Sequence, residues 1–261
     1  MKKFGLIGSN LTNTFSKKFF EEKFLSLNLK DHAFENYSLG NIDELETLLK
    51  DEELCGLMVT VPYKMEVIKF LNELDETARE VGAVNCVKIV DRSKIIDHSL
   101  PSNAKSQTAK KLIGYNTDVI GFENSLKPFI QNFKGKALIL GTGGAAKAVA
   151  FVLLKLKIDC TFVSRNPKSE NEISYTSLSK KIIEEHQLII NCTSVGMFPD
   201  ISESPGIPYE FISNNHFIYD LIYLPEETFF LKNCKAKGAK TKNGMEMLQL
   251  QAEEGLRIFL D

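Results

Sequence analysis

ALILGTGGAAKAV, residues Ala137–Val149, is the stretch that decides the fold. It joins a short apolar strand to a helix, and between them Gly141, Gly143 and Ala146 fit the pattern G-x-G-x-x-A. The first glycine permits a tight turn, the second lets the backbone approach a pyrophosphate, and the small third residue lets the helix pack closely. The N-terminus of the helix offers N–H groups to the phosphates. The stretch therefore predicts dinucleotide binding, with a glycine-rich turn that binds no ligand as the alternative.

The strand after this helix distinguishes NAD from NADP. An NAD-selective site places Asp or Glu at the end of that strand, where the carboxylate accepts from the ribose 2′-OH. Here the strand DCTFV, residues 159–163, is followed by Ser164, Arg165 and Asn166, with Lys168 close by. A guanidinium in place of a carboxylate suits a 2′-phosphate. The sequence therefore predicts NADP(H), and a surface arginine at a strand end is the alternative for Arg165.

Short apolar strands alternate with amphipathic helices along most of the chain, which favours an α/β fold with largely parallel sheets. We expect two α/β domains, the first over residues 1–118 and completed by a C-terminal helix within 242–261, the second over 119–241. A polar stretch over 91–111 predicts a hairpin with a long mobile excursion outside the chemistry. Strands are expected over 3–8, 32–39, 56–61, 86–90, 111–115, 159–163, 188–191 and 216–223, and helices over 16–27, 42–50, 119–131, 225–238 and 245–259.

Composition narrows the class of protein. The 261 residues are 43% hydrophobic and 25% charged with a formal net charge of −2, which is typical of a globular protein and gives no indication of nucleic-acid or membrane binding. Five scattered cysteines without paired spacing argue against a disulfide framework or a zinc site. The start, MKKFGLIGSN, has too short an apolar run for a signal peptide. We therefore expect a cytoplasmic protein.

A resemblance extends over almost the whole chain. The ordered motifs VTVPYK, VGAVNCV, GYNTD, GTGGAAKA, VSRN, NCTSVGM, YDLIY and NGMEMLQLQA resemble those of the shikimate dehydrogenase family. The resemblance implies NADP-dependent, reversible reduction of 3-dehydroshikimate to shikimate, in the pathway that supplies aromatic amino acid precursors. It also implies an N-terminal α/β substrate domain and a Rossmann-like NADP-binding domain with a cleft between them. Monomer and homodimer both remain open.

The resemblance makes Lys64 and Asp118 the catalytic pair. Hydride addition to a ketone produces a developing alkoxide, which an ammonium can stabilise and protonate. A neighbouring carboxylate would hold that ammonium in position. Pro62 has no N–H to donate and is expected to end the strand before Lys64. Without the resemblance, Lys64 would be a solvated lysine at a strand end and Asp118 the N-cap of the next helix.

The resemblance also assigns the ligand contacts. It places Thr14 and Ser16 at the substrate carboxylate and Thr60 and Asn85 at substrate hydroxyls. From the residues alone, Thr14 and Ser16 could be an N-cap pair and Asn85 a turn residue. The other substrate contacts are Tyr223 and Gln251; a surface position is the alternative for Gln251. The cofactor-binding residues are Gly141, Thr142, Gly143, Gly144, Ala145, Ser164, Arg165, Asn166, Lys168, Thr193, Leu221 and Gly244.

Four positions depart from the family pattern. The chain has Asn13-Thr14 where the family usually has His-Ser, Met58 where it has Asn, and Val119 where Gly is frequent. Thr14 keeps a hydroxyl but adds a methyl group, and Met58 could only pack. These departures leave quinate, with relaxed cofactor use, or an amino analogue open as substrates. A catalytically idle NADP-binding redox sensor is a further alternative. The four histidines lie in no matching motif, so we expect no metal site.

Overall fold

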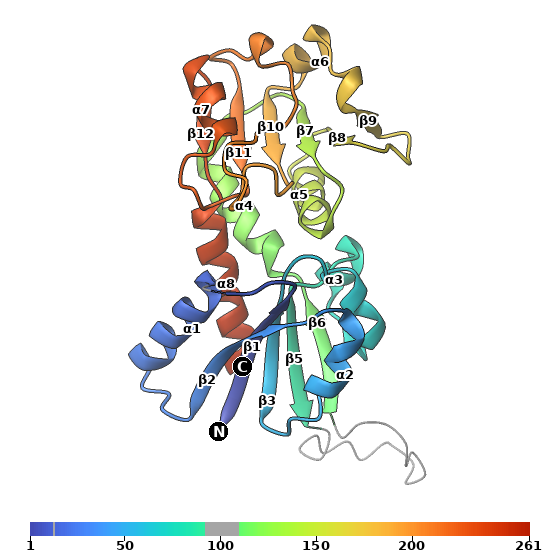
Figure 1. Cartoon of the computed structure of the whole chain (residues 1–261). Helices are drawn as coiled ribbons and strands as arrows, with labels where there is room; N and C mark the ends of the chain where they lie inside the picture. The colour runs from blue at the N-terminus through green and yellow to red at the C-terminus, as the bar shows by residue number, and fades with distance from the viewer. Residues whose placement is uncertain (13, 92–109) are drawn as a thin grey trace. The chain divides into compact units, whose positions relative to one another are not determined.

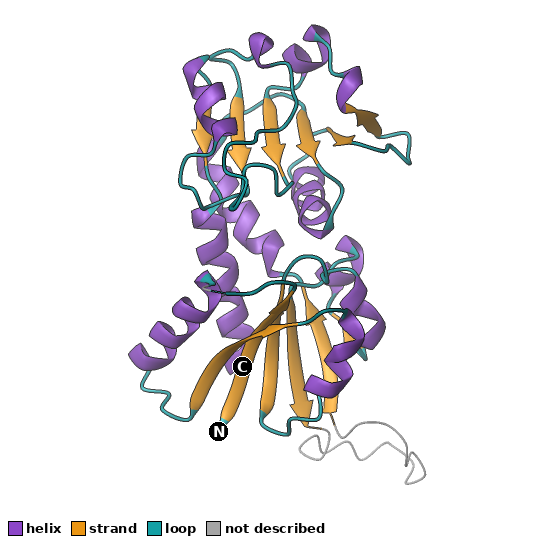
Figure 2. Cartoon of the chain, in the orientation of Figure 1, coloured by secondary structure: helices purple, strands orange, loops and turns teal. Residues whose placement is uncertain are grey.

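The computed structural model describes residues 1–12, 14–91 and 110–261 and divides into two units. Unit 1 consists of Met1–Thr117 together with Ala252–Asp261, and unit 2 of Asp118–Gln251. Each unit contains a six-stranded sheet flanked by helices (Figure 1, Figure 2). The predicted α/β class is therefore confirmed.

The sheet of unit 1 contains β1 (Lys2–Gly8), β2 (His32–Ser38), β3 (Leu54–Val59), β4 (Glu73–Leu74), β5 (Cys86–Asp91) and β6 (Lys110–Tyr115). Its strand order is β2-β1-β3-β5-β6-β4. The first three strands run parallel, β5 is antiparallel to β3, and β6 is antiparallel to β5. The carboxyl ends of β1, β3 and β6 and the amino end of β5 therefore meet at one edge.

Both faces of this sheet are covered by α1 (Phe15–Ser26), α2 (Leu45–Leu48), α3 (Glu76–Val81), the end of α8 (Met245–Leu260), and the 3-10 segments η1 (Ile42–Glu44) and η2 (Glu66–Phe70). Side chains alternate between the faces along β3. Leu57 and Val59 belong to the core under η1, α2 and η2, while Met58 belongs to the core under α1 and α8. Met58 lies under Gly255 of α8, where an added Cβ would come within 2.8 Å of its sulfur. This methionine packs, as we expected.

The sheet of unit 2 contains β7 (Ala137–Leu140), β8 (Cys160–Ser164), β9 (Glu172–Ser174), β10 (Leu188–Asn191), β11 (Phe217–Asp220) and β12 (Lys240–Lys242). All five neighbouring pairs are parallel, in the order β12-β11-β10-β7-β8-β9. The chain starts at the central β7, moves outward through β8 to β9, and returns to β10 on the other side of β7. This is the Rossmann order, and its direction reverses between β7 and β10.

Helices also cover this sheet, namely α4 (Thr117–Phe129), α5 (Gly144–Lys155), α6 (Lys180–Glu185), α7 (Phe229–Ala236) and the 3-10 segments η4 (Tyr175–Ser177) and η5 (Tyr209–Phe211). Every residue of β7 and β10 is buried, as expected for parallel strands covered on both faces. Glu123 joins α4 to α5, since its carboxylate lies 2.5 Å from Lys127 Nζ and 2.8 Å from Lys155 Nζ.

The helix expected over 42–50 consists of η1 and α2 and ends at Leu48, and three further predicted elements were too long. The strand expected over 56–61 ends at Val59, because the chain turns where Tyr63 N donates to Thr60 O. The strand expected over 216–223 ends at Asp220, whose side chain accepts from Ile222 N. The helix expected over 225–238 begins only at Phe229. In each case a local hydrogen bond or cap, which apolar periodicity does not reveal, ends the element.

The start of α7 shows this capping directly. Thr228 has an extended backbone and its side chain accepts from Leu231 N, which makes it the N-cap. The short helix α3 was not predicted, although Asp75 caps its start and Gly82, with φ +66°, ends it. The strands β4, β9 and β12 and the helix α6 were not predicted either; each has at most six residues.

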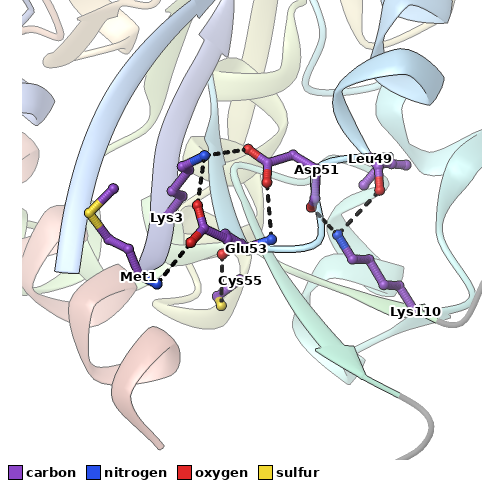
Figure 3. A network of polar contacts seen from close by, with 7 residues as sticks. All are labelled: Met1, Lys3, Leu49, Asp51, Glu53, Cys55 and Lys110. Atoms are coloured by element: carbon purple, nitrogen blue, oxygen red, sulfur yellow. Dashed lines mark hydrogen bonds and ion pairs between the residues drawn. The ribbon is translucent and has the colours of Figure 1, made fainter. Parts of the chain in front are cut away.

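Charged groups hold the amino edge of the first sheet (Figure 3). Lys3 Nζ lies 2.9 Å from both Asp51 Oδ2 and Glu53 Oε2, and Glu53 also pairs with the amino terminus. Lys110 Nζ donates to Leu49 O and Asp51 O. Hydrogen bonds to Glu53 and then Asp51 raise the pKa of Lys3. Because β1, β3 and β6 all begin here, this network fixes the edge opposite their carboxyl ends.

The predicted hairpin is confirmed where β5 and β6 pair, out to Asp91 opposite Lys110. The excursion predicted over 91–111 lies almost wholly outside the described residues. No helix in the described part of the chain is long and apolar enough to cross a membrane.

Candidate functional site

The carboxyl edge of the first sheet gathers most of the predicted substrate residues. Thr60 directly follows β3, and Asn85 directly precedes β5. Val59 N donates to Asn85 O at 2.7 Å and Thr60 N donates to Ile7 O at 2.9 Å. Because β5 runs antiparallel to β3, backbone pairing alone brings Thr60 and Asn85 to one edge, although they lie 25 positions apart in the sequence.

The backbone around Lys64 is fixed on both sides. Tyr63 is buried, and its hydroxyl donates to Leu39 O at 2.7 Å. Val84 N donates to Lys64 O at 2.8 Å. The Lys64 side chain is half-buried rather than fully solvated. This segment therefore presents Lys64 from a fixed backbone at the edge where Thr60 and Asn85 lie.

Asn85 and Thr117 bind each other through both ends of the asparagine amide. Asn85 Nδ2 donates to Thr117 Oγ1 at 2.9 Å, and Thr117 N donates to Asn85 Oδ1 at 2.7 Å. The pair fixes the start of α4 and so the backbone leading to Asp118. Asp118 is 4% exposed and lies in the first turn of α4, inside the helix rather than before it. A carboxylate in a first turn is favoured by the helix dipole.

Thr14 is the N-cap of α1. Its hydroxyl oxygen accepts from Lys17 N at 3.3 Å, and its hydroxyl hydrogen is donated to Asn36 Oδ1 at 2.9 Å. The amide of Asn36 in turn donates to Thr12 O at 2.7 Å. The N-cap alternative is therefore confirmed for Thr14. Ser16 lies inside α1 and is buried, so it is not a second cap.

The glycine-rich turn lies at the carboxyl end of β7, beside the point where the strand order reverses. Gly141 has φ +103°, which only glycine adopts readily, and Gly143 caps α5. An added Cβ at Gly143 would find no atom of the described residues within 4 Å. Ala146 is fully buried. The three positions thus do what the pattern requires: a tight turn, an open approach to the backbone, and close packing of the helix.

The predicted 2′-phosphate residues lie at the end of the neighbouring strand. β8 pairs with β7, so Ser164 and the exposed Arg165, Asn166 and Lys168 follow the strand beside the glycine turn. Asn166 N donates to Ser164 Oγ at 3.2 Å, which shapes this turn. The donor groups present, a guanidinium and an ammonium, fit a phosphate dianion.

Thr193, Leu221 and Gly244 complete the same edge. Thr193 N and Oγ1 both donate to Asn191 Oδ1, at 3.0 and 2.7 Å. Gly244 packs against the backbone of Leu221, since an added Cβ would lie 2.0 Å from Leu221 O. Gly244 N donates to Ile222 O at 3.1 Å. The loops after β10, β11 and β12 are therefore held by one another.

Sequence reasoning missed Asp220, which is fully buried at the end of β11. Its carboxylate accepts from Asn191 Nδ2, Ile222 N and Thr228 Oγ1 at 3.0, 3.1 and 2.6 Å. Burial raises the pKa of Asp220 to about 6, although these hydrogen bonds act in the opposite direction. The signal in the sequence was an aspartate within an otherwise apolar strand, FIYDLI.

Two substrate residues from the prediction lie in unit 2. Tyr223 follows β11 and is half-buried, and burial raises its pKa. Gln251 lies in α8 and is only 6% exposed, so the surface alternative for it was wrong. Its amide donates to Leu248 O at 3.0 Å. Among the residues that the structure describes, no group of histidine, cysteine and carboxylate side chains could hold a metal ion.

The chain is similar to known proteins over its full length. The family model described as "Shikimate dehydrogenase substrate binding domain" matches residues 6–87. The NADP(+) shikimate dehydrogenase of Caldicellulosiruptor saccharolyticus is 34% identical, over 100% of this chain and 93% of that protein. The corresponding protein of Methanococcus maripaludis strain C6 is 35% identical, over 99% of this chain and 91% of its own.

Solved structures give the same result. The crystal structure of shikimate dehydrogenase 1 from Peptoclostridium difficile matches with a TM-score of 0.82 and 33% identity, covering 100% of this chain and 92% of that one. The Thermus thermophilus enzyme in complex with NADP(H) and shikimate matches with a TM-score of 0.81 and 29% identity, covering 99% and 93%. The chain belongs to the shikimate dehydrogenase family.

Proposed function

We propose that this protein catalyses the NADP-dependent, reversible reduction of 3-dehydroshikimate to shikimate. One observation carries the proposal. The carboxyl edge of the second sheet has a glycine turn open above Gly143 with Arg165 at the end of the adjacent strand, in a chain that resembles NADP(+) shikimate dehydrogenases over its full length. We assign cofactor binding to unit 2 and substrate binding mainly to unit 1.

The cofactor would be held by the glycine turn and by the turn after β8. The N–H groups of Gly144 and Ala145, in the first turn of α5, are the donors for the pyrophosphate. Arg165 and Lys168 would bind the 2′-phosphate, with Ser164 and Asn166 shaping their turn. NADP(H), when bound, supplies or accepts the hydride. Thr142, Thr193, Leu221 and Gly244 complete the proposed binding set.

Lys64 is the proposed general acid and base. In the direction of reduction its ammonium donates a proton to the oxygen that was the ketone, and in oxidation its amine takes the hydroxyl proton. Asp118 is the proposed partner that keeps this side chain in place. The backbone of Lys64 is held by the buried Tyr63 on one side and by the hydrogen bond from Val84 N on the other. This supports the assignment, because proton transfer requires an accurately placed donor.

Thr60 and Asn85 are the proposed contacts to substrate hydroxyls, and Tyr223 and Gln251 are further proposed substrate contacts. Thr14 and Ser16 are proposed to lie near the substrate carboxylate, with Ser16 as its donor. One observation favours a second candidate, quinate. The Thr14 hydroxyl donates its hydrogen bond to Asn36 and not to a ligand. The pocket for the substrate carboxylate therefore has one hydroxyl donor fewer than a pocket in which both hydroxyls bind the ligand. Such a pocket would admit a related hydroxy acid.

The proposal is tested by initial rates of NADP+ reduction with shikimate and quinate in parallel, and with NAD+ as the cofactor control. We expect turnover with shikimate and NADP+ to exceed every other combination. Preference for quinate would keep the fold and the role of Lys64 but overturn the substrate. NADPH binding without turnover of either acid would instead indicate a redox sensor.

Two finer points are also proposals. A cytoplasmic location is supported by five scattered cysteines without paired spacing. A monomer or homodimer is consistent with the sequence, and size-exclusion chromatography with light scattering would distinguish them.

A further inference from the structure

We propose that Asp220 is a positioning residue for the cofactor, acting through Asn191 on Thr193. This inference rests on the proposed function, because it concerns how unit 2 presents its carboxyl edge to NADP(H). It assigns a role to a buried carboxylate that takes no part in the proposed proton transfer.

The geometry of the network follows from which groups can donate. The Asp220 carboxylate is surrounded by three donors, namely Asn191 Nδ2, Ile222 N and Thr228 Oγ1. The ionised carboxylate can only accept, so it satisfies all three. An amide in its place can keep one oxygen where it accepts from Asn191 Nδ2 and Ile222 N, and turn its NH2 group to the Thr228 hydroxyl, which can accept. Asparagine is therefore the conservative variant at this position, and alanine, which removes both acceptor oxygens, is the disruptive one.

Asp220 also decides which way the Asn191 amide faces. With Nδ2 held by the carboxylate, Oδ1 must point to Thr193, where it accepts from both N and Oγ1. If the amide turned over, its NH2 group would meet the N–H of Thr193, that contact would be lost, and the Thr193 hydroxyl would have to turn its hydrogen away. The Thr193 hydroxyl also accepts from Val195 N at 3.2 Å, so the orientation is passed on into the loop after β10.

This loop lies against the glycine turn. A Cβ built on Gly141 would lie 3.1 Å from Thr193 Cγ2, so the threonine packs on the first glycine of the turn. On the other side, Leu221 follows Asp220 directly, and its carbonyl forms the surface against which Gly244 packs. One buried carboxylate thus connects the loops after β7, β10, β11 and β12. All four lie at the edge proposed to hold the cofactor.

The outer member of the network offers a milder variant. Thr228 both donates to Asp220 and caps α7 by accepting from Leu231 N. Thr228→Val removes the hydroxyl at nearly constant volume, and Thr228→Ser restores it. A buried hydrogen bond elsewhere in unit 2 supplies the control. Ser125 Oγ lies 2.8 Å from Tyr219 OH and donates to Phe122 O at 3.1 Å, on the side of the sheet covered by α4, and Ser125→Ala removes both contacts without touching the Asp220 network.

The experiment measures NADPH binding by fluorescence titration and unfolding of the ligand-free protein by thermal melting. Wild type must bind NADPH; if it does not, the proposed function fails rather than this inference. We expect Asp220→Ala, which leaves these buried donors without their acceptor, to raise the Kd for NADPH about tenfold, the order expected when buried hydrogen bonds are lost, and to raise the KM for NADP+ more than it lowers kcat. Ser125→Ala should lower the melting temperature but leave the Kd unchanged.

A double-mutant cycle distinguishes positioning from general loosening. If Asp220 acts through Thr193, Asp220→Ala should have little further effect on the Kd in a Thr193→Val background. Additive effects would overturn the proposed path, and an unchanged Kd in Asp220→Ala with a lowered melting temperature would overturn the proposal. Should Asp220→Ala not fold, Thr228→Val decides: a weaker NADPH affinity that Thr228→Ser restores supports the proposal, and an unchanged Kd overturns it.

Discussion

The hydroxyl of Thr14 donates to Asn36 Oδ1 at 2.9 Å and so joins the loop between β1 and α1 to β2. The direction of this bond is fixed, because the other end of the Asn36 amide donates to Thr12 O, which can only accept. The same hydroxyl oxygen caps α1. A substrate carboxylate that accepted from Thr14 would therefore have to replace Asn36. Ser16, the second residue of α1, does not cap the helix.

This relationship separates the two hydroxyls experimentally. We expect Thr14→Ala to lower the free energy of unfolding by about 1 kcal/mol through loss of the cap, with a small change in the KM for shikimate. Ser16→Ala should instead raise that KM by roughly 10-fold, as expected for a hydrogen bond to a charged ligand, with stability nearly unchanged. Steady-state kinetics and urea unfolding measure both. Thr14→Ser, which keeps the cap, is the control. A larger KM effect for Thr14→Ala than for Ser16→Ala would contradict this division.

The open space at Gly143 allows a substitution that should weaken NADPH binding without affecting folding. Its φ of −77° suits any residue, and an added Cβ meets nothing in the described part of the protein. Gly143→Ala should therefore fold normally. NADPH binding should weaken by about 10-fold or more, because the methyl group would occupy the space that the pyrophosphate needs. Gly206→Ala is the matched control, since its added Cβ is equally unobstructed by the described residues. Equal NADPH affinities for the two variants would refute a pyrophosphate at this turn.

Arg165 tests the preference for NADP(H). It is exposed at the end of β8, so its removal should not affect folding. Loss of a charge-assisted contact to phosphate corresponds to about 1.5–3 kcal/mol, or roughly 10- to 100-fold in Kd. Arg165→Ala should weaken NADPH by this factor and leave NADH unchanged, measured by titration at one fixed salt concentration. Arg165→Lys keeps the positive charge without the planar guanidinium, so its Kd for NADPH should lie between those of wild type and Arg165→Ala. Equal losses of affinity for NADPH and NADH would show that Arg165 does not bind the 2′-phosphate.

Asp220 gives a pH-dependent prediction for stability. Burial raises the pKa of this carboxyl in the folded protein to about 6, above the ordinary value of 3.8 that the unfolded chain should show. The folded state therefore holds the proton more tightly, so the contribution of this group is present at low pH and is lost as pH rises through about 6. Two pKa units correspond to roughly 3 kcal/mol.

The measurement compares unfolding free energies of wild type and Asp220→Asn at pH values from 4 to 7. The difference between the two proteins cancels the other titrating groups. We expect the destabilisation by Asp220→Asn to be largest near pH 4 and to shrink as pH approaches 7. A difference that stays constant, or grows with pH, would show that the three hydrogen bonds outweigh burial.

The sequence predicted the fold where apolar pattern and glycine chemistry act locally. The structure confirmed the alternation of strands and helices and the turn around Gly141. The comparisons confirmed the family of NADP(+) shikimate dehydrogenases. The bounds of β11 and α7 were wrong because side-chain bonds of Asp220 and Thr228 set them. Such bonds have no periodicity to read.

The site was less predictable, for a related reason. The partner of Thr14 lies 22 residues away, and Asn85 meets Thr117 across 32 residues. Only the completed sheet brings such pairs together. The assigned roles of Lys64, Asp118 and the ligand contacts stay predictions, which makes Lys64 the most informative residue to test.

Lys64→Ala should lower kcat by roughly 10²- to 10⁴-fold, the range for losing a positioned proton donor, because no other group would protonate the developing alkoxide as efficiently. NADPH affinity should change little, since the cofactor residues belong to unit 2. Lys69→Ala is the matched control: it lies in the same segment, but its ammonium is exposed and pairs with Asp43 at 2.7 Å. Initial rates with shikimate and NADP+ measure kcat, and titration measures the NADPH Kd. A Lys64→Ala protein with most of its turnover, or a Lys69→Ala protein with an equal loss, would show that the strand end does not deliver a catalytic ammonium.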